Sequence, residues 1–174
     1  SSYRYLKSFK DMNGLNAACI AAAPVVNGIA RAMEMEIIPV SGSTADFKTN
    51  LSDKTLQALD ALKKYDFVIL HIKGCDVTSH DKKPELKRLF IEKIDREVFR
   101  RILEYTDFEK TLVVVTSDHP TSSKTGQHVA GFMPFLFFTK GVEANKVLKF
   151  DEEECKQGPI INIEDFMEEV LNYV

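Results

Sequence analysis

Residues 67–76 read FVILHIKGCD and residues 111–119 read TLVVVTSDH, so two apolar runs each end beside an aspartate. Apolar runs of this length, without alternating polar residues, are typical of strands that are covered on both faces. Between them, apolar residues recur at every fourth position over residues 86–102, which predicts one long amphipathic helix. This alternation of strands and helices predicts an α/β fold, with a mainly parallel sheet and helices on both of its faces.

Shorter patterns extend the alternation along the whole chain. Three apolar runs predict further strands, at residues 16–22, 36–40 and 134–138. Pro24 is suited to the first turn of a helix, Ser52 or Asp53 can cap a second helix, and Asn162 can cap the last one. No internal repeat, low-complexity tract or linker interrupts the pattern, so we expect a single domain over residues 1–174.

Composition and charge exclude several classes of protein. The chain is 44% hydrophobic and 28% charged, which is typical of a globular protein. A net charge of -3, without a dense basic stripe, argues against nucleic acid as a partner. No apolar run is long enough to span a bilayer, and the N-terminal residues lack the pattern of a secretory signal. Three widely spaced cysteines favour a reducing compartment, so we expect a cytoplasmic protein.

Three of the four histidines lie near carboxylates at spacings that suit a metal ion. Asp76 and His80 follow the first apolar run, Asp118 and His119 end the second, and His128 comes nine residues later. Ligands in α/β folds gather at the carboxyl ends of strands, so we expect these side chains on one edge of the sheet. Imidazole and carboxylate groups bind zinc and harder divalent cations. The pattern predicts a phosphoryl-transfer centre, with two ions about 3.5–4 Å apart.

Each cluster also has a structural explanation. A lone histidine after a strand is commonly a hydrogen-bonded core residue, and Asp-His is a common surface dipeptide. Only the joint pattern, with His128 added, favours metal binding over these alternatives. His71 lies inside the first apolar run and is predicted to be structural. Lys73, three residues before Asp76, is a candidate cation for substrate, and a solvated lysine at a strand end is an equal alternative.

Three segments resemble the cofactor-independent phosphoglycerate mutases, in particular their archaeal-type branch within the alkaline phosphatase superfamily. They are residues 17–50, residues 67–81 and residues 111–135. The most specific part is the series D-x-x-x-H, then D-H, then a histidine nine residues further on. The resemblance implies an alkaline-phosphatase-like metalloenzyme core, of which this chain is expected to be the C-terminal half.

The resemblance also implies a role for each matching residue. One manganese-type ion is expected on Asp76, His80 and His128. A second is expected on Asp118 and His119, together with an aspartate and a nucleophilic serine from the N-terminal segment of the family. That serine carries the phosphoryl group between the two hydroxyls of phosphoglycerate. Two divalent ions are therefore expected, with Mn²⁺ first and Zn²⁺, Mg²⁺ or Co²⁺ as alternatives.

The sequence departs from the family pattern in two respects. We find neither the nucleophilic serine in its family context nor the inserted substrate-binding domain. We therefore expect a fragment, a proteolytic product or one chain of a split protein, which has weak or no activity alone and the missing N-terminal half as a partner. Asn27 stands before Gly28 where relatives often carry a lysine, so one phosphate-neutralising charge is replaced.

These observations leave three hypotheses for function. The first is a phosphoglycerate mutase that interconverts 3- and 2-phosphoglycerate in glycolysis. The second is another phosphomonoesterase or phosphomutase of the same superfamily, because such enzymes share metal ligands while their substrate contacts differ. The third is a catalytically silent metal-binding fragment. In the first two, the expected partner is phosphoglycerate or another small phosphate ester, with neither nucleic acid nor a membrane.

Overall fold

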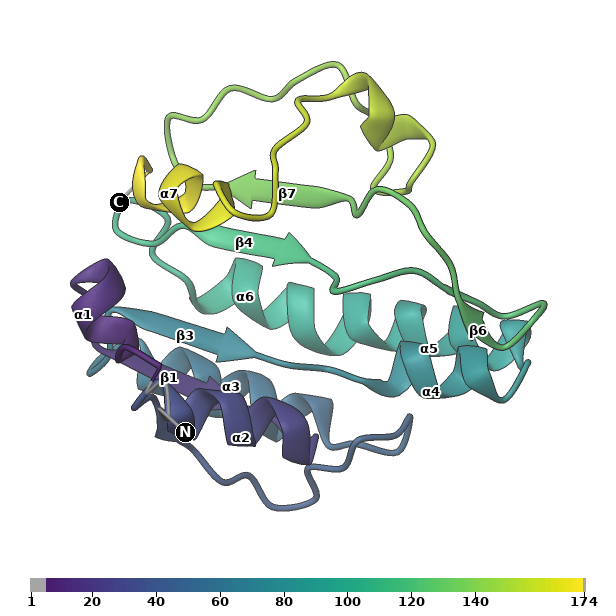
Figure 1. Ribbon diagram of the computed structural model, residues 1–174, viewed down its shortest axis with the longest axis horizontal. Coiled ribbons are helices and arrows are strands. Elements are labelled where there is room, and N and C mark those ends of the chain that lie inside the picture. The colour runs from purple at the N-terminus through teal and green to yellow at the C-terminus, as the bar shows by residue number, and fades with distance from the viewer. Residues whose placement is uncertain (1–5, 174) are drawn as a thin grey trace, which may run out of the picture. The chain divides into compact units, whose positions relative to one another are not determined.

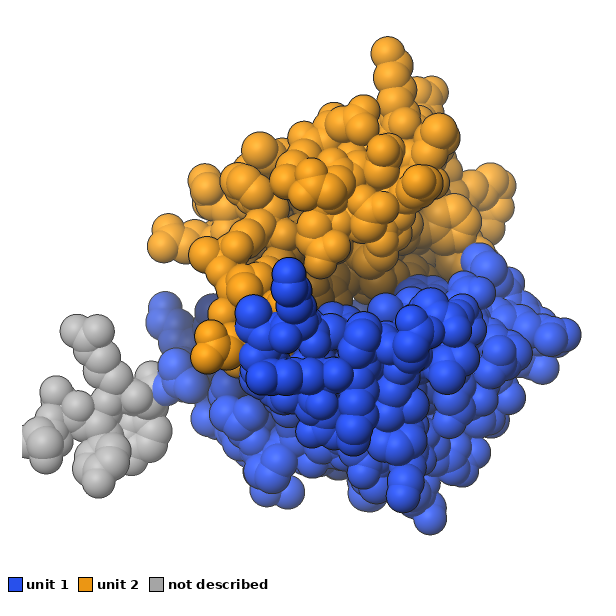
Figure 2. All heavy atoms as spheres, turned by 90° about the vertical axis from the view of Figure 1, so that its right-hand side faces the viewer, with its two compact units in different colours: residues 1–105, 123–126 blue, residues 106–122, 127–174 orange. Residues whose placement is uncertain are grey.

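The computed structural model describes residues 6–173, and the chain divides into two compact units (Figure 1). Unit 1 contains the described residues up to 105 together with 123–126, and unit 2 contains 106–122 and the residues from 127 on (Figure 2). Unit 1 contains a three-stranded sheet, and unit 2 contains two two-stranded sheets among its described residues. The single domain expected from the sequence therefore stays a prediction.

Unit 1 is built on a three-stranded parallel sheet. Its strands are β1 (Ala17–Ile20), β2 (Glu36–Ile37) and β3 (Phe67–Leu70), in the order β2-β1-β3. β1 pairs with β3 in register from Ala17 opposite Phe67 to Ile20 opposite Leu70. All four residues of β1 are buried, which fits a central strand that is covered on both faces.

Helices cover both faces of this sheet. α2 (Pro24–Ala32) connects β1 to β2, and α3 (Leu51–Ala61) connects β2 to β3. Since β2 and β3 flank β1 on opposite sides and such crossovers are right-handed, the two helices lie on opposite faces (Figure 1). α1 (Phe9–Asn13) stacks Phe9 on the ring of Phe67, with the ring centroids 4.7 Å apart. The predicted α/β fold with a parallel sheet and helices on both faces is confirmed.

The helix starts agree only partly with the sequence analysis. Pro24 is the first residue of α2, as predicted. The cap of α3 is Asn50, which accepts a hydrogen bond from the backbone N–H of Asp53, so the prediction of Ser52 or Asp53 was two or three residues late. Asn50 suits this position because its short side chain reaches the unpaired N–H groups of the first turn.

The predicted long helix is continuous but contains a π-helical segment. It runs through α5 (Pro84–Ile94), η1 (Asp95–Phe99) and α6 (Arg100–Tyr105). Each four-residue step turns an α-helix about 40° past a full turn, so a strict four-residue repeat drifts away from the core. A π-helical turn contains more residues, which offsets this drift. As a result Val98 is 3% exposed and Ile102 packs against the same core cluster.

That core cluster supports the helix that follows β3. It consists of Leu51, Phe90 and Val98, with several half-buried side chains packed around them. α4 (Gly74–His80) begins against it, and Cys75 is one of the side chains in contact. A β-carbon on Gly74 would lie 2.4 Å from Cε1 of Phe90, so glycine is required for this close approach.

We expect Gly74→Ala to lower the free energy of unfolding by about 1–3 kcal/mol, because the added methyl group overpacks the core at Phe90. Urea unfolding followed by circular dichroism measures this change. Gly28→Ala is the matched control, since Gly28 lies inside α2 with no other atom near its added β-carbon. That control should stabilise the protein by about 0.5–1 kcal/mol. A Gly74→Ala variant as stable as the wild type would contradict the packing argument.

Unit 2 contains antiparallel strands. β4 (Val113–Thr116) pairs with β7 (Phe135–Phe138), and the short strands β5 (Thr121–Ser122) and β6 (Gln127–His128) form a hairpin. The chain ends in η2 (Glu154–Gln157) and α7 (Phe166–Leu171).

Two details of unit 2 were not foreseen. The apolar run at residues 134–138 predicts a strand but not its direction. In the structure this strand, β7, pairs antiparallel with β4. α7 begins after Asp165, and Asn162, the predicted cap, donates instead to the carboxylate of Asp165 at 3.3 Å. Within the described part of the chain, no helix is long and apolar enough to cross a membrane.

Candidate metal centre

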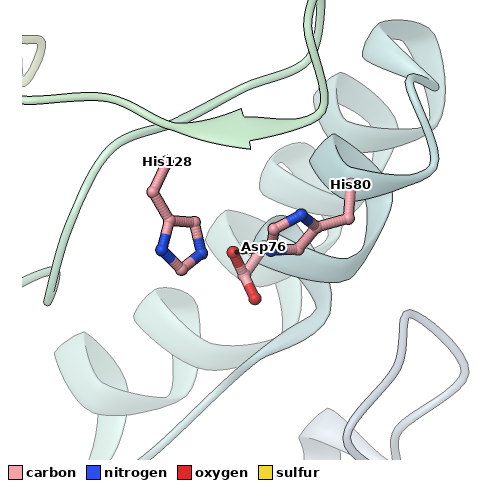
Figure 3. Close-up of side chains that lie close together, drawn as sticks. All are labelled: Asp76, His80 and His128. Atoms are coloured by element: carbon pink, nitrogen blue, oxygen red, sulfur yellow. Dashed lines mark ion pairs between the residues drawn. The ribbon is translucent and has the colours of Figure 1, made fainter.

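Helix α4 brings the first pair of predicted ligands together. Asp76 and His80 are one helical turn apart, so their side chains project from the same face of α4 (Figure 3). Oδ1 of Asp76 lies 3.2 Å from Nε2 of His80. The Asp76 side chain is largely buried, while that of His80 is 43% exposed, so the pair is accessible from the imidazole side.

The hydrogen bond of Nδ1, the other ring nitrogen of His80, determines which of the two nitrogens carries the proton. Nδ1 lies 2.8 Å from the carbonyl oxygen of Gly126. A carbonyl only accepts hydrogen bonds, so Nδ1 is the donor and a neutral His80 has its lone pair on Nε2. That lone pair and the Asp76 carboxylate are both acceptors, and they repel each other unless a proton or a metal ion lies between them.

This arrangement fits a divalent cation. Metal-binding histidines commonly donate their second N–H to a carbonyl or a carboxylate, which fixes the ring for coordination. His80 has this partner in Gly126, and Asp76 adds an oxygen ligand at the same place. Mixed imidazole and carboxylate ligands suit zinc, manganese and related ions.

The loop tip at residues 123–126 belongs to unit 1 and packs on α4. Gly126 has φ of +73°, and a β-carbon there would lie 2.9 Å from the backbone oxygen of His80, so this position requires glycine. Ser123 donates a hydrogen bond of 3.3 Å to the hydroxyl of the buried Ser79. The sequence analysis missed Gly126, although a Thr-Gly pair in a polar loop is a recognisable turn signal.

Lys73 faces the same carboxylate as His80. It is the residue just before α4, and its Nζ lies 2.9 Å from Oδ2 of Asp76. The side chain of Lys73 is 37% exposed, so it is partly solvated as well as paired with this carboxylate. Its contact with substrate stays a prediction.

The second pair of predicted ligands lies in unit 2, just after β4. Nε2 of His119 is 3.2 Å from Oδ2 of Asp118, and Nδ1 of His119 is 3.1 Å from the hydroxyl oxygen of Thr121. The backbone N–H of His119 donates to Oδ1 of Asp118 at 3.0 Å. Adjacent side chains usually diverge, but this local turn directs both toward each other.

His128 joins this pair within unit 2. It lies on β6 opposite Thr121 of β5, and its ring stacks on that of His119 with the centroids 3.7 Å apart. His128 also follows Gly126 by only two residues, a distance that the chain spans in at most about 7 Å. Covalent connection therefore limits how far His128 can lie from the carbonyl that binds His80. Convergence of both clusters on one sheet edge stays a prediction, because they belong to different units.

Two other residues singled out in the sequence have structural contacts. The backbone carbonyl of His71 accepts a hydrogen bond from Lys54 at the end of β3. Asn27 lies in the first turn of α2 and donates to the carbonyl of Ala21 at 3.2 Å, which ties this helix to the end of β1. The amide of Asn27 therefore has a structural role at the start of α2.

Comparison with known proteins assigns the family. Residues 1–172 match the model of the metalloenzyme superfamily. The chain belongs to the metalloenzyme superfamily. The resemblance noted in the sequence is confirmed.

Two archaeal proteins are similar to this chain over most of its length. The 2,3-bisphosphoglycerate-independent phosphoglycerate mutase of Methanococcus aeolicus is 37% identical over 153 residues, which are 88% of this chain and 37% of that protein. The corresponding mutase of Picrophilus torridus is 35% identical over 155 residues, which are 89% of this chain and 38% of that protein. The chain thus spans less than two fifths of the length of these relatives.

Two solved structures are also similar to this chain. A Pyrococcus horikoshii protein is 32% identical with a TM-score of 0.88, and the match covers 97% of this chain and 52% of that one. The cofactor-independent phosphoglycerate mutase of Thermoplasma acidophilum is 26% identical with a TM-score of 0.68, over 95% of this chain and 39% of that one.

Proposed function

We propose that this chain provides the divalent-metal centre of a 2,3-bisphosphoglycerate-independent phosphoglycerate mutase, an isomerase that interconverts 3- and 2-phosphoglycerate in glycolysis. The observation that carries the metal centre is His80, whose Nδ1 is held by Gly126 while Nε2 faces Asp76. The substrate is proposed because the archaeal relatives that match most of the chain carry this name. All three cysteines are free thiols, which is compatible with the reducing cytoplasm where glycolysis takes place.

In this proposal the ligands divide into two sets. We assign Asp76, His80 and His128 to a first ion, to which each would give one ligand atom. Asp118 and His119 offer a carboxylate and an imidazole to a second ion. We favour Mn²⁺ for both, with Zn²⁺, Mg²⁺ or Co²⁺ as alternatives, because nitrogen and oxygen ligands without thiolates suit all of these ions.

In the proposed phosphoryl transfer, the protein mainly holds the ligands and the substrate in place. Two divalent ions, when bound, neutralise the charge of a transferring phosphoryl group and lower the pKa of an attacking hydroxyl. Gly126 keeps the proton of His80 on Nδ1 and so keeps Nε2 available as a ligand. Lys73 pairs with Asp76, and in our proposal its ammonium would also neutralise charge on the phosphate of the substrate.

An assay of the full-length protein with added Mn²⁺ tests the proposal. We expect conversion of 3-phosphoglycerate to 2-phosphoglycerate, followed by enolase-coupled absorbance, without release of inorganic phosphate. Release of phosphate from several esters would indicate a phosphomonoesterase instead. Binding of Mn²⁺ without turnover of any phosphate ester would indicate a catalytically silent metal-binding protein.

A further inference from the structure

Lys54 of α3 is a buried cation for which the proposed chemistry gives no role. Its side chain is 1% exposed, and it is the largest of the fully buried side chains among the described residues. Its ammonium donates a hydrogen bond of 2.5 Å to the carbonyl oxygen of His71. Burying an ammonium is costly unless hydrogen bonds or opposite charges compensate. Within the part of the chain that the structure describes, no carboxylate forms a salt bridge with Lys54.

The carbonyl that Lys54 binds lies at the end of β3. The backbone N–H of His71 donates to the carbonyl of Ile20 at 2.9 Å, which continues the pairing of β1 with β3 by one residue. Both backbone groups of His71 are therefore held, the N–H by β1 and the carbonyl by Lys54. The chain leaves the sheet at this point.

Only two residues separate this point from α4. They are Ile72, which packs against the core cluster, and Lys73, whose carbonyl accepts hydrogen bonds from the N–H groups of Asp76 and Val77 at 3.0 and 3.3 Å. The position of His71 thus determines where the first turn of α4 begins, and this turn carries Asp76. A shift at His71 would move Asp76 and the rest of α4 relative to the loop tip at residues 123–126.

We propose that Lys54 is a positioning residue of the metal centre, which holds the His71 carbonyl so that α4 presents Asp76 for coordination. In its effect on metal binding this inference rests on the proposed function. A role in filling space is the main alternative. The apolar stem of lysine has nearly the shape of methionine, so Lys54→Met keeps the filled volume and removes only the donor.

Metal affinity separates the two roles. With Mn²⁺ titrated calorimetrically into the full-length protein, we expect Lys54→Met to bind about 10–100-fold more weakly than the wild type, as loss of an outer-shell partner typically does. Lys54→Gln keeps a neutral donor on a shorter stem and should fall between the two. Thr55→Val is the matched control, because Thr55 is equally buried on α3 and its hydroxyl bonds only within that helix, to Leu51. Its affinity should stay within about twofold of the wild type, since none of the ligands depends on it.

Hydrogen exchange without metal tests the same inference independently of any ion. In Lys54→Met the amides of Asp76 and Val77 should exchange faster, while those of α2 keep wild-type rates. If the wild type binds no Mn²⁺, the proposed metal centre is wrong, and this exchange pattern still decides whether Lys54 holds α4.

The inference is overturned by any of three results. One is wild-type Mn²⁺ affinity and wild-type exchange at α4 in a folded Lys54→Met protein. Another is failure of both Lys54 variants to fold, which would show that the ammonium serves the fold as a whole. Equal losses in Lys54→Met and Thr55→Val would likewise assign the effect to α3 packing.

Discussion

Replacing His80 by alanine should remove one Mn²⁺ ion from the binding stoichiometry of the full-length protein. His80 is proposed to supply a ligand atom directly, so we expect a loss of more than about 100-fold, beyond the 10–100-fold typical of outer-shell changes. His128→Ala should have the same effect if it completes the site. Isothermal titration calorimetry and electron paramagnetic resonance of Mn²⁺ both measure the number of ions bound per protein molecule.

Two further variants sharpen this test. His71→Gln is the matched control. It removes an imidazole at the end of β3 but keeps the backbone carbonyl that Lys54 binds. Its stoichiometry should equal that of the wild type. Gly126→Ala keeps all ligands, but alanine is strained at the φ of +73° and its β-carbon would contact the His80 backbone. This variant should therefore show an intermediate loss of Mn²⁺ affinity. Full stoichiometric binding in both His80→Ala and His128→Ala would rule out the assigned first site.

The stability of the wild type relative to Lys54→Met should rise by about 3 kcal/mol between pH 8 and pH 10.5. Burial lowers the pKa of Lys54 from 10.5 to about 8 in the folded protein. In this interval the unfolded chain therefore binds more protons at Lys54 than the folded chain, and stability increases with pH wherever that is so. The groups near the ammonium are the His71 carbonyl and Cys19, and burial raises the pKa of the Cys19 thiol.

The difference between the two proteins isolates this effect. Other lysines, tyrosines and cysteines titrate in the same range, and those that do not interact with Lys54 contribute equally to both proteins. Cys19 lies near the ammonium, so the difference reports Lys54 together with its effect on this thiol. Urea unfolding at steps of half a pH unit gives the free energy of unfolding for each. A difference that stays flat from pH 8 to pH 10.5 would show that Lys54 keeps an ordinary pKa and is hydrated.

Much of unit 1 could be predicted from the sequence, because local patterns determine it. The apolar run at β3 and the proline at the start of α2 are signals that a few neighbouring residues contain. The parallel order β2-β1-β3 follows from the alternation of strands and helices together with right-handed crossovers. The cap at Asn50 was also visible in principle, since it precedes Asp53 at the spacing of a capping motif.

Other features had no local signal. The antiparallel direction of β7 depends on the path of the chain after the β5–β6 hairpin, and the apolar pattern of a strand is the same in either direction. The π-helical segment at Asp95–Phe99 arises because the four-residue repeat must stay on the core cluster, which only the packed structure reveals.

The sequence by itself determined the fold class, the family resemblance and the residue types of a metal centre, since side-chain chemistry and short-range periodicity are written in neighbouring residues. Only the tertiary structure showed that Gly126 fixes the proton of His80 and that Lys54 holds the end of β3. Both contacts join a side chain to a backbone carbonyl distant in sequence, and carbonyls are the same in every residue. No pattern of residue types can identify such an acceptor until the chain is folded.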